Sequence, residues 1–446
     1  MTSGQSHSGE TLMNAIADRR ARVGVIGLGY VGLPLAVTAA KAGFSVIGLD
    51  VDSTKTVRLV AGTSYIDAVS DSDLAEITDH VEWSTDFAQL AEIDVIVICV
   101  PTPLTRQREP DLSFIETTAH SIARHLTPAT LVVLESTTWP GTTRDVLTPI
   151  LETSGLTSGE DVFFGYSPER EDPGNAVYRT KTIPKIVAGD GALAGDLAEA
   201  FYSAVVETVV RVPDTGTAEA VKITENIFRA VNIALVNELK VIYDAMGIDV
   251  WDVVQGASSK PFGYMPFYPG PGLGGHCIPI DPFYLTWRAR EFDVPTRFIE
   301  LAGEINTAMP RYVVDRLRAV LDAATGRGLN GADVLLVGVA YKKNVSDMRE
   351  SPAMRLMQLL EEAGARVQFL DPHVPEIPPM REYGRFEARA AIAPETVAGV
   401  GFDAVLIATD HDAIDYAALL DLGCPVVDTR NAIAGRDLSM ARVTKA

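Results

Sequence analysis

The chain has little cysteine and little positive charge, and each shortage excludes a class of protein. Three cysteines, Cys99, Cys277 and Cys424, are too few for a disulfide framework in 446 residues. A reducing compartment such as the cytoplasm is therefore expected. The 38 Lys and Arg residues are outnumbered by 59 Asp and Glu, which gives a formal net charge of −21. Nucleic acids and anionic membrane surfaces select basic faces, so neither is an expected partner.

Long apolar runs and metal-ligand patterns are also missing, and no leader sequence is expected. No run reaches the length that crosses a bilayer. Residues 1–20 are polar, so we expect a disordered tail and no signal peptide. The seven histidines are scattered, which predicts no catalytic metal. The nucleophile-elbow pattern G-x-S-x-G is absent, which disfavours a Ser–His–Asp hydrolase.

Short apolar runs alternate with helical periodicity from Arg22 onward, which is typical of βαβ units on a parallel sheet. The pattern predicts a helix at 30–43 and strands at 22–26, 44–49, 94–100, 130–135, 185–188 and 208–211. Residues 214–245 almost lack Gly and Pro and predict one long helix, with further helices at 281–292 and 296–323. After a glycine-rich linker at 326–331, strand-like runs return at 333–340, 367–371 and 403–409.

These patterns predict an α/β fold with two Rossmann-like, doubly wound domains joined by a long central helix and a helical spine. We expect the tail at 1–20, the first Rossmann domain at 21–213, the helical domain at 214–325 and the second Rossmann-like domain at 326–446. The second domain lacks a glycine fingerprint. Two such domains suggest two nucleotide-bearing ligands.

A glycine loop follows the first predicted strand and opens a helix, which favours dinucleotide binding over a merely tight turn. Asp50 ends the next strand, where a carboxylate accepts hydrogen bonds from ribose hydroxyls and repels a 2′-phosphate, so NAD is expected rather than NADP. The residues predicted to line the pyrophosphate are Gly27, Gly29, Tyr30, Val31 and Gly32. Pro101, Thr102 and the Ser136-Thr137 pair follow later strands, at the edge of the sheet where cofactors lie. The hydroxyls of Thr102, Ser136 and Thr137 either cap helices or contact cofactor and substrate.

Cys277 follows four glycines in the segment 270–281, and Asp281 comes four residues later. Glycines let the backbone approach a ligand closely, and a thiol beside a carboxylate suits covalent catalysis at a carbonyl. The alternative is a glycine-rich turn around a buried, inert cysteine. His276 would lower the thiol pKa only if the two side chains faced each other, and neighbours in a turn often point apart.

Lys222 and Asn226 are spaced i, i+4 and project from one face of the long predicted helix. A cation beside an amide donor suits stabilisation of an oxyanion, whereas the alternative is a solvated polar stripe. Glu169 lies in the loop Ser167-Pro-Glu-Arg170 after a strand, either as a site carboxylate or as an ordinary surface one.

In this order the motifs resemble the UDP-glucose/GDP-mannose dehydrogenase family of nucleotide-sugar 6-dehydrogenases, over residues 21 to 435. The resemblance also includes Pro140-Gly-Thr-Thr143, Ala340-Tyr-Lys-Lys343 and Asp347-Met-Arg-Glu-Ser-Pro352. It implies that the C6 hydroxyl of a nucleotide-linked hexose is oxidised twice, with two NAD⁺, to a carboxylate. The implied route is a Cys277 thiohemiacetal and then a thioester, which is hydrolysed.

The resemblance also implies residue roles. Lys222 and Asn226 would steady oxyanions, Asp281 would position or activate water, and Thr137 and Glu169 would act at the same centre. Arg349 would contact NAD. The implied substrate contacts are Glu169, Arg170, Lys222, Asn226, Phe267, Tyr268, Gly274 and Lys342. The implied assembly is a homodimer through the long helix.

The segment 260–285 looks most like the branch that acts on UDP-N-acetylhexosamines. UDP-glucose members usually carry Cys-x-x-Lys-Asp, and Ile280 stands here in place of that lysine. A UDP- or TDP-glucose dehydrogenase is the runner-up. A non-catalytic nucleotide-sugar sensor is the alternative of another class, while an epimerase is disfavoured because no Tyr-x-x-x-Lys pair follows the sheet. The nucleotide base and the C2 substituent stay open.

Overall fold

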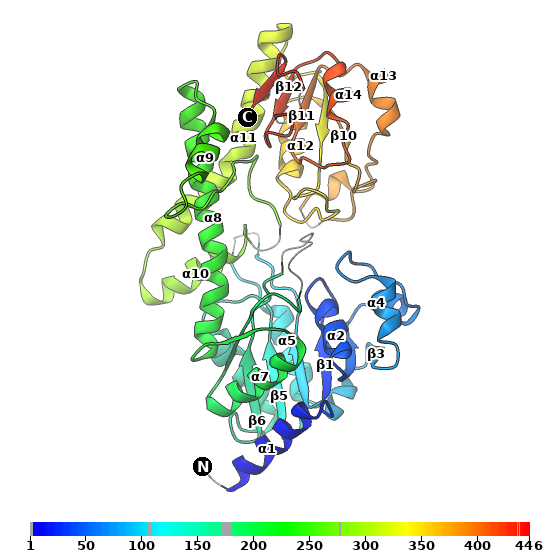
Figure 1. The fold of residues 1–446 in the computed structure, drawn as a ribbon, viewed down its shortest axis with the longest axis vertical. Helices are drawn as coiled ribbons and strands as arrows, with labels where there is room; N and C mark the ends of the chain where they lie inside the picture. Colours follow the sequence, from blue (N-terminus) through cyan, green and yellow to red (C-terminus); the bar gives the residue numbers. More distant parts are fainter. Residues whose placement is uncertain are drawn as a thin grey trace. The chain divides into compact units, whose positions relative to one another are not determined.

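The computed structural model describes residues 3–105, 109–171, 180–275, 278–380, 382–434, 436 and 438–446 (Figure 1). The chain divides into two compact units. The first unit comprises Met1–Glu225 with Phe283–Val294, and the second comprises Asn226–Pro282 with Pro295–Ala446. Helix α8 (Thr215–Ala245) begins in the first unit and ends in the second. None of the described helices is long and apolar enough to cross a membrane.

The first unit is built on an eight-stranded sheet in the order β3-β2-β1-β4-β5-β6-β7-β8. Its strands are β1 (Arg22–Ile26), β2 (Ser45–Leu49), β3 (Val81–Ser84), β4 (Val95–Ile98), β5 (Thr130–Leu134), β6 (Val162–Tyr166), β7 (Lys185–Gly189) and β8 (Val209–Arg211). The central strands β4 and β5 are buried at every position, as expected for a sheet covered on both faces.

One strand pair departs from the expected parallel sheet. Strands β6 and β7 are antiparallel, with Gly165 opposite Gly189, whereas the other described pairs are parallel. A strand that runs antiparallel beside its predecessor needs no helical crossover. As a result, β7 begins near the carboxyl end of β6.

The helices of the first unit are α1 (Ser3–Ala17), α2 (Gly32–Lys41), α3 (Ser53–Val60), α4 (Asp71–Glu76), α5 (Ser113–Ala123), α6 (Thr148–Leu151) and α7 (Ala192–Val205). Shorter turns are η1 (Phe87–Glu92), the π-turn η2 (Thr143–Leu147), η3 (Glu152–Ser154) and η4 (Arg290–Phe292).

The expected disordered tail at residues 1–20 was wrong, because helix α1 occupies most of it. Leu12 and Ile16 lie one helical turn apart and are buried in the core that also contains Leu197 of α7. The apolar face of α1 therefore packs on α7, and burial of these side chains stabilises the helix. The polar first residues hide this short apolar stripe in the sequence.

The second unit contains a wholly parallel sheet in the order β10-β9-β11-β12-β13. Its strands are β9 (Asp333–Val337), β10 (Arg366–Leu370), β11 (Ala404–Ile407), β12 (Val426–Asp428) and β13 (Val443–Lys445). The order β10-β9-β11-β12 repeats the order β2-β1-β4-β5 of the first sheet. The two sheets therefore share the Rossmann-type topology that the sequence predicts.

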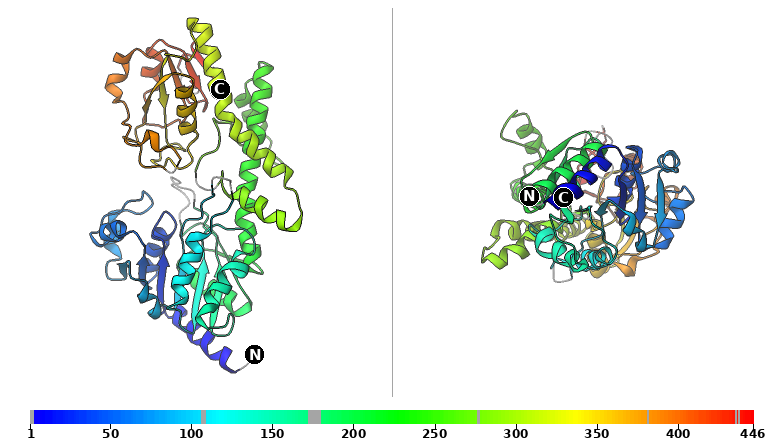
Figure 2. Two further views of the ribbon diagram at one scale, coloured as in Figure 1. Left: turned by 180° about the vertical axis from the view of Figure 1, so that it is seen from behind. Right: turned by 90° about the horizontal axis from the view of Figure 1, so that it is seen from below.

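Helices α11 and α12 pack on this second sheet, and Figure 2 shows α11 running beside it. The helices that lie wholly in this unit are α9 (Val250–Ser258), α11 (Arg297–Thr325), α12 (Pro352–Glu362), α13 (Val397–Val400) and α14 (Tyr416–Asp421), with turns η5 (Gly384–Phe386) and η6 (Pro394–Thr396). Helix α10 (Asp281–Ala289) begins in this unit and continues into the first. The long helix predicted at 214–245 and the helices predicted at 281–292 and 296–323 agree with α8, α10 with η4, and α11 within a few residues.

Candidate active site and the family of the chain

The glycine loop between β1 and α2 has the geometry of a phosphate cradle. Gly27 has a φ of +91°, and a Cβ there would stand 2.6 Å from the Cys99 carbonyl oxygen. A Cβ on Gly32 would overlap the Gly27 carbonyl oxygen, so both positions exclude side chains. By contrast, a Cβ on Gly29 would meet nothing within 4 Å. The first and last glycines are thus required by packing, and the middle one faces open space at the start of a helix.

Asp50, directly after β2, is buried beside this loop. Its Oδ2 accepts a hydrogen bond from the Leu28 amide at 2.9 Å and pairs with Lys55 at 2.8 Å. A carboxylate beside a glycine cradle that opens a helix is the donor and acceptor set that an adenosine ribose and a pyrophosphate require. These residues therefore fit NAD.

Hydrogen bonds hold the loops that follow strands β4 and β5. The Ser136 hydroxyl donates to the Val100 carbonyl at 2.7 Å, and the Thr102 carbonyl accepts from the Tyr284 hydroxyl at 2.8 Å. Thr102 is buried, Thr137 is half-buried and Pro101 is exposed. The Ser136 hydroxyl thus joins the β4 and β5 loops and still lies at the carboxyl edge, where cofactor contact is predicted.

Glu219 of α8 holds the segment that follows Thr137. Its carboxylate accepts hydrogen bonds from the Gly141 amide and from both the amide and the hydroxyl of Thr143, the latter two at 2.8 and 2.7 Å. Burial raises the pKa of Glu219 to about 7, against these hydrogen bonds. We infer that α8 fixes the loop between β5 and η2, a role that sequence reasoning missed.

The loop after β6 brings three predicted residues together in the first unit. The Lys222 ammonium donates to the backbone carbonyl of Glu169. The Arg170 guanidinium forms two hydrogen bonds with Glu225, at 2.5 and 3.2 Å, and one with the Pro184 carbonyl at 2.8 Å. Helix α8 therefore anchors this loop through Lys222 and Glu225.

In the second unit, Asn226 and Asp281 meet. The Asn226 Nδ2 donates to the Asp281 Oδ2 at 2.5 Å, and both residues are buried. Asp281 opens α10, and Asn226 lies one helical turn after Lys222 on α8. An amide and a carboxylate separated by 55 residues are thus held in contact. From the sequence, their proximity was implied only by the family resemblance.

The glycine loop of residues 270–275 packs within the second unit. A Cβ on Gly274 would stand 2.8 Å from Tyr341 and 2.9 Å from Pro352, and the Gly275 amide donates to the Arg349 carbonyl at 3.0 Å. The glycines thus allow close packing against the segment that follows β9. Cys277 and His276, the predicted nucleophile and its neighbour, lie outside the described residues.

The remaining predicted ligand contacts are spread over the second unit. Phe267 packs edge-on against Phe228 with ring centroids 5.7 Å apart, and Tyr268 stacks on Trp251 at 5.5 Å. The Arg349 side chain forms an ion pair with Asp347 at 2.7 Å and is 41% exposed. Lys342 is half-buried.

Arg430 is a second residue that sequence reasoning missed. It follows β12, its Nε donates to the Ala408 carbonyl at 2.9 Å, and a Cβ on Gly270 would stand 2.6 Å from its Nη1. A guanidinium at the carboxyl edge of a Rossmann-type sheet suits a diphosphate. Arg430 was missed because β12, the strand before it, has only three residues and shows no periodic pattern in the sequence.

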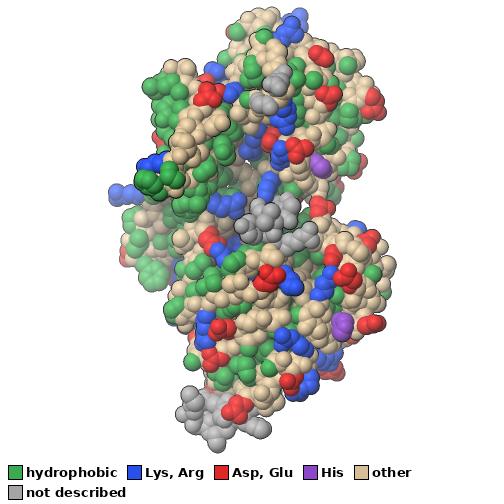
Figure 3. Space-filling model, viewed as in Figure 1, with side chains coloured by type: hydrophobic (Ala, Val, Ile, Leu, Met, Phe, Trp, Pro, Cys, Tyr) green, Lys and Arg blue, Asp and Glu red, His purple; other side chains and the backbone are tan. Residues whose placement is uncertain are grey.

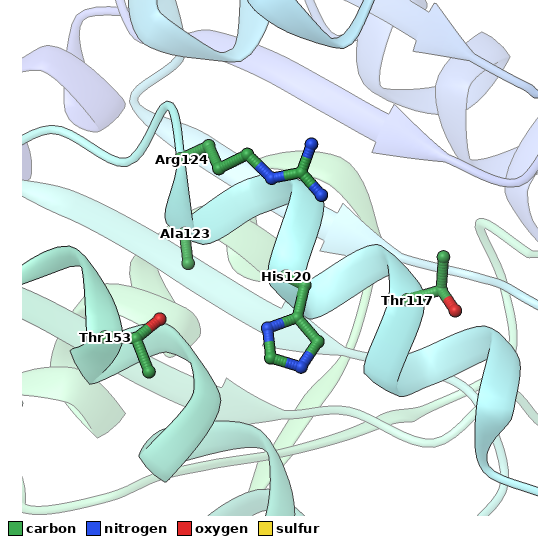
Figure 4. Close-up of a pocket in the computed structure, with 5 residues that line it drawn as sticks. All are labelled: Thr117, His120, Ala123, Arg124 and Thr153. Atoms are coloured by element: carbon green, nitrogen blue, oxygen red, sulfur yellow. The ribbon is translucent and has the colours of Figure 1, made fainter.

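A pocket elsewhere in the first unit is lined by Thr117, His120, Ala123, Arg124 and Thr153 (Figure 4). These residues lie at the end of α5 and in η3, each of which precedes a strand, so the pocket is at the amino edge of the sheet. None of the predicted site residues lines it.

A chain with two Rossmann-type sheets, a dinucleotide cradle and buried polar pairs on a long helix belongs to the class of NAD-dependent dehydrogenases with a second nucleotide-binding domain. The sequence matches the UDP-glucose/GDP-mannose dehydrogenase family in all three of its parts: the NAD binding domain over residues 21–206, the central domain over 216–308 and the UDP binding domain over 335–435. The chain therefore belongs to this family.

Named relatives support the same conclusion. A UDP-N-acetyl-D-glucosamine 6-dehydrogenase from Pseudomonas aeruginosa is 36% identical over 396 residues, which cover 87% of this chain and 90% of the relative. The structure of a UDP-D-ManNAc dehydrogenase from Pyrococcus horikoshii has a TM-score of 0.86 at 30% identity, covering 95% of this chain and 98% of that one. A UDP-glucose dehydrogenase from Pyrobaculum islandicum has a TM-score of 0.81 at 28% identity, with 94% and 96% covered.

These matches confirm the family, the α/β fold class and the NAD dependence predicted from the sequence. The protein is an NAD-dependent nucleotide-sugar dehydrogenase, an oxidoreductase. The fold alone does not discriminate between sugars, because structures of both kinds superpose on it closely.

Proposed function

We propose that the protein oxidises the C6 hydroxyl of a UDP-N-acetylhexosamine, UDP-N-acetylglucosamine or UDP-N-acetylmannosamine, to the carboxylate in the cytoplasm. Relatives that bear these names support the choice of sugar, as does Ile280, which stands where UDP-glucose members usually have a lysine. In this proposal residues 21–213 form the NAD-binding domain and residues 326–446 form the domain that binds the nucleotide sugar. Residues 214–325 form the helical domain between them in the sequence.

The observation that carries the proposal is the buried pair of Asn226 and Asp281. Asp281 lies four residues after Cys277, so the second unit supplies a thiol, an amide donor and a carboxylate from one short stretch and one helix. Oxidation of an alcohol to an acid through a thioester needs this set: a nucleophile, an oxyanion donor and a group that directs water.

The proposed oxidation proceeds through an aldehyde, a thiohemiacetal and a thioester. Two NAD⁺ molecules, bound in turn, would each accept one of the two hydrides. The C6 alcohol loses a hydride and a proton to give an aldehyde, the Cys277 thiolate adds to its carbonyl carbon, and the oxyanion formed takes up a proton to give a thiohemiacetal. The thiohemiacetal loses a second hydride and a proton, which leaves a thioester. Water, directed by Asp281, then cleaves the carbon–sulfur bond to release the acid and the thiol.

The other predicted residues have supporting roles. Lys222 and Asn226 stabilise the oxyanions of the addition and hydrolysis steps. Glu169 and Thr137 act at the same centre. Arg170, Phe267, Tyr268, Gly274 and Lys342 contact the substrate, and Arg349 contacts NAD.

The test is the yield of NADH with UDP-N-acetylglucosamine, UDP-N-acetylmannosamine, UDP-glucose and TDP-glucose measured side by side. We expect two NADH per sugar with an N-acetylhexosamine substrate, and Cys277→Ser should not complete the acid. Preferred turnover of a glucose substrate would replace the proposed sugar with the runner-up. Binding without any NADH would favour the non-catalytic sensor.

We also infer a homodimer through α8. Three exposed apolar residues repeat every seven positions on this helix: Phe228, Leu235 and Ile242, which are 48%, 50% and 45% exposed. Hydrophobic side chains gather over α8 and α9 in Figure 3. A stripe with this period is the seam along which helices associate.

Leu235→Glu tests the dimer, because a charge in the middle of the stripe opposes burial. Sedimentation should show a dimer for the wild type and a monomer for this variant. Val400→Glu, at an apolar residue of the same unit that is 38% exposed but lies outside α8, is the matched control and should stay dimeric. A monomeric wild type would refute the inference.

A further inference from the structure

A buried ionic cluster underlies the loop that carries Glu169. Its members come from different elements of the first unit, and the described ionisable groups that take part are Cys99 after β4, Glu135 after β5, Glu169 and Glu171 after β6, Lys185 in β7, Tyr202 in α7 and Lys222 in α8. Neither Glu135 nor Lys185 is required to build a strand, and charged residues are rarely fully buried unless they are paired. The cluster therefore calls for a functional explanation.

Lys185 lies between two carboxylates. Its Nζ is 2.9 Å from Glu135 Oε2 and 3.5 Å from Glu169 Oε2. The Lys185 side chain is 5% exposed and that of Glu135 is fully buried. Tyr202 donates to the other oxygen of Glu135 at 2.5 Å. Although burial lowers the pKa of Lys185, the two carboxylates raise it more, so the lysine stays a cation.

The Glu169 carboxylate is held on both sides. Its Oε1 accepts hydrogen bonds from the Arg170 amide at 2.6 Å and from the Glu171 amide, and its Oε2 faces Lys185. Within the part of the chain that the structure describes, Lys185 is the cation at ion-pair distance from this carboxylate. Glu171, also in the cluster, keeps a proton at neutral pH, because burial and the charge of Glu169 raise its pKa to about 8.

We propose that Lys185 is a positioning residue: its ammonium holds the Glu169 carboxylate in the orientation that the reaction needs, while Glu135 contacts the lysine from the other side. The inference rests on the proposed function, since that is where the role of Glu169 comes from. The competing explanation is that Lys185 only neutralises the buried Glu135. The two explanations predict different values of kcat when the charges of Glu135 and Lys185 are removed together.

The variants Glu135→Gln, Lys185→Met and the double variant E135Q/K185M separate them. In E135Q the Gln oxygen can still accept from Lys185, and the lysine keeps its pairing with Glu169, so kcat should stay within about threefold of wild type. K185M leaves the buried Glu135 and the half-buried Glu169 without their shared cation and should lower both kcat and stability. The double variant should regain wild-type resistance to urea, because no unpaired Glu135 remains, yet keep a kcat about tenfold to a hundredfold lower with KM nearly unchanged.

The same double variant is then built on Glu169→Gln. If Lys185 acts through Glu169, adding E135Q/K185M to E169Q should lower kcat no further. Recovery of kcat together with stability in E135Q/K185M would overturn the proposal, and so would an added loss in the E169Q background. Lys41→Met, which removes an exposed ion pair with Asp73 and Glu76, is the matched control and should leave kcat unchanged.

Failure of the Lys185 role and failure of the proposed function give different results in these experiments. All variants are compared on whichever nucleotide sugar the wild type oxidises, so a different sugar changes the proposed function and leaves the comparison intact. If the wild type yields two NADH per sugar while E135Q/K185M matches its kcat, only the role of Lys185 fails.

Discussion

Asp50 and Asp371 hold equivalent positions in the two Rossmann-type sheets. Each follows the second strand of its sheet, and each accepts a backbone amide hydrogen bond from the loop after the first strand: from Leu28 at 2.9 Å and from Val339 at 2.7 Å. Their further partners differ. Asp50 pairs with the partly exposed Lys55, whereas Asp371 is closed off by the fully buried His411 at 3.1 Å. Only the first carboxylate is therefore placed to meet a ribose.

Replacing Asp50 tests this difference. Asp50→Asn keeps an acceptor for the Leu28 amide but removes the charge, so the affinity for NAD should fall about tenfold or more. Titration of NAD against the purified variant measures this, with circular dichroism as the check on folding. Asp371→Asn should leave the NAD affinity unchanged; an equal loss in both variants would contradict the assignment of NAD to the first sheet.

The glycines of the first loop should respond differently to alanine. Gly29→Ala places a methyl group in open space, so the variant should fold normally and lose NAD affinity. Gly32→Ala forces an overlap with the Gly27 carbonyl and should destabilise the whole unit. Thermal unfolding with and without NAD distinguishes the two effects. Full NAD affinity in Gly29→Ala would show that no ligand approaches that position.

The contact between Asn226 and Asp281 predicts a rescue by exchange. Asn226→Asp puts two buried carboxylates within hydrogen-bond distance, so one must keep a proton and stability should fall as pH rises. Adding Asp281→Asn restores an amide–carboxylate pair and should restore stability. Acid formation should stay low in the double variant, because the carboxylate no longer lies where it directs water. Recovery of activity as well would mean that the pair serves folding alone.

Lys240 of α8 gives the protein a pH-dependent stability. It is 3% exposed, and among the described residues its Nζ has no hydrogen-bond partner. Burial lowers its pKa from 10.5 to about 8. Between these two values the unfolded chain binds the proton more tightly than the folded one, so stability rises with pH across that window and the penalty is complete below it.

Lys240→Met removes this charge and should flatten that part of the pH profile. At neutral pH it should raise the free energy of unfolding by on the order of 3 kcal/mol. Urea unfolding at neutral and alkaline pH measures both effects. A variant less stable than the wild type at neutral pH would show instead that the lysine is favourably paired in the folded protein.

Much of the fold follows from local patterns. Buried parallel strands are continuous apolar runs, so β1, β4, β5 and β9 could be located from their residues alone, and the lack of Gly and Pro identified α8. Helix α1 was missed because tertiary packing of Leu12 and Ile16, rather than propensity, stabilises it. β3, β12 and β13 are too short or too polar for a pattern, and the antiparallel turn from β6 to β7 has no local signature.

The site residues also fall into those that local patterns predict and those that only the fold brings together. Motifs on one loop or one helix, such as Gly27 to Gly32 and the pair Lys222 and Asn226, can be recognised by their spacing. The cluster of Glu135 and Lys185 joins residues 50 positions apart, and only the sheet order brings them together. A lysine at the start of an otherwise apolar strand was the one sign of it in the sequence.

The central claim is that Cys277 carries the sugar as a thioester. The most direct test is the mass of the Cys277 peptide from Asp281→Asn, quenched in acid during turnover of the preferred nucleotide sugar with NAD. Because hydrolysis is slowed in this variant, a nucleotide-sugar acyl adduct should appear on Cys277 alongside the NADH formed. An unmodified Cys277 peptide while Cys277→Ala still produces the acid would contradict the account.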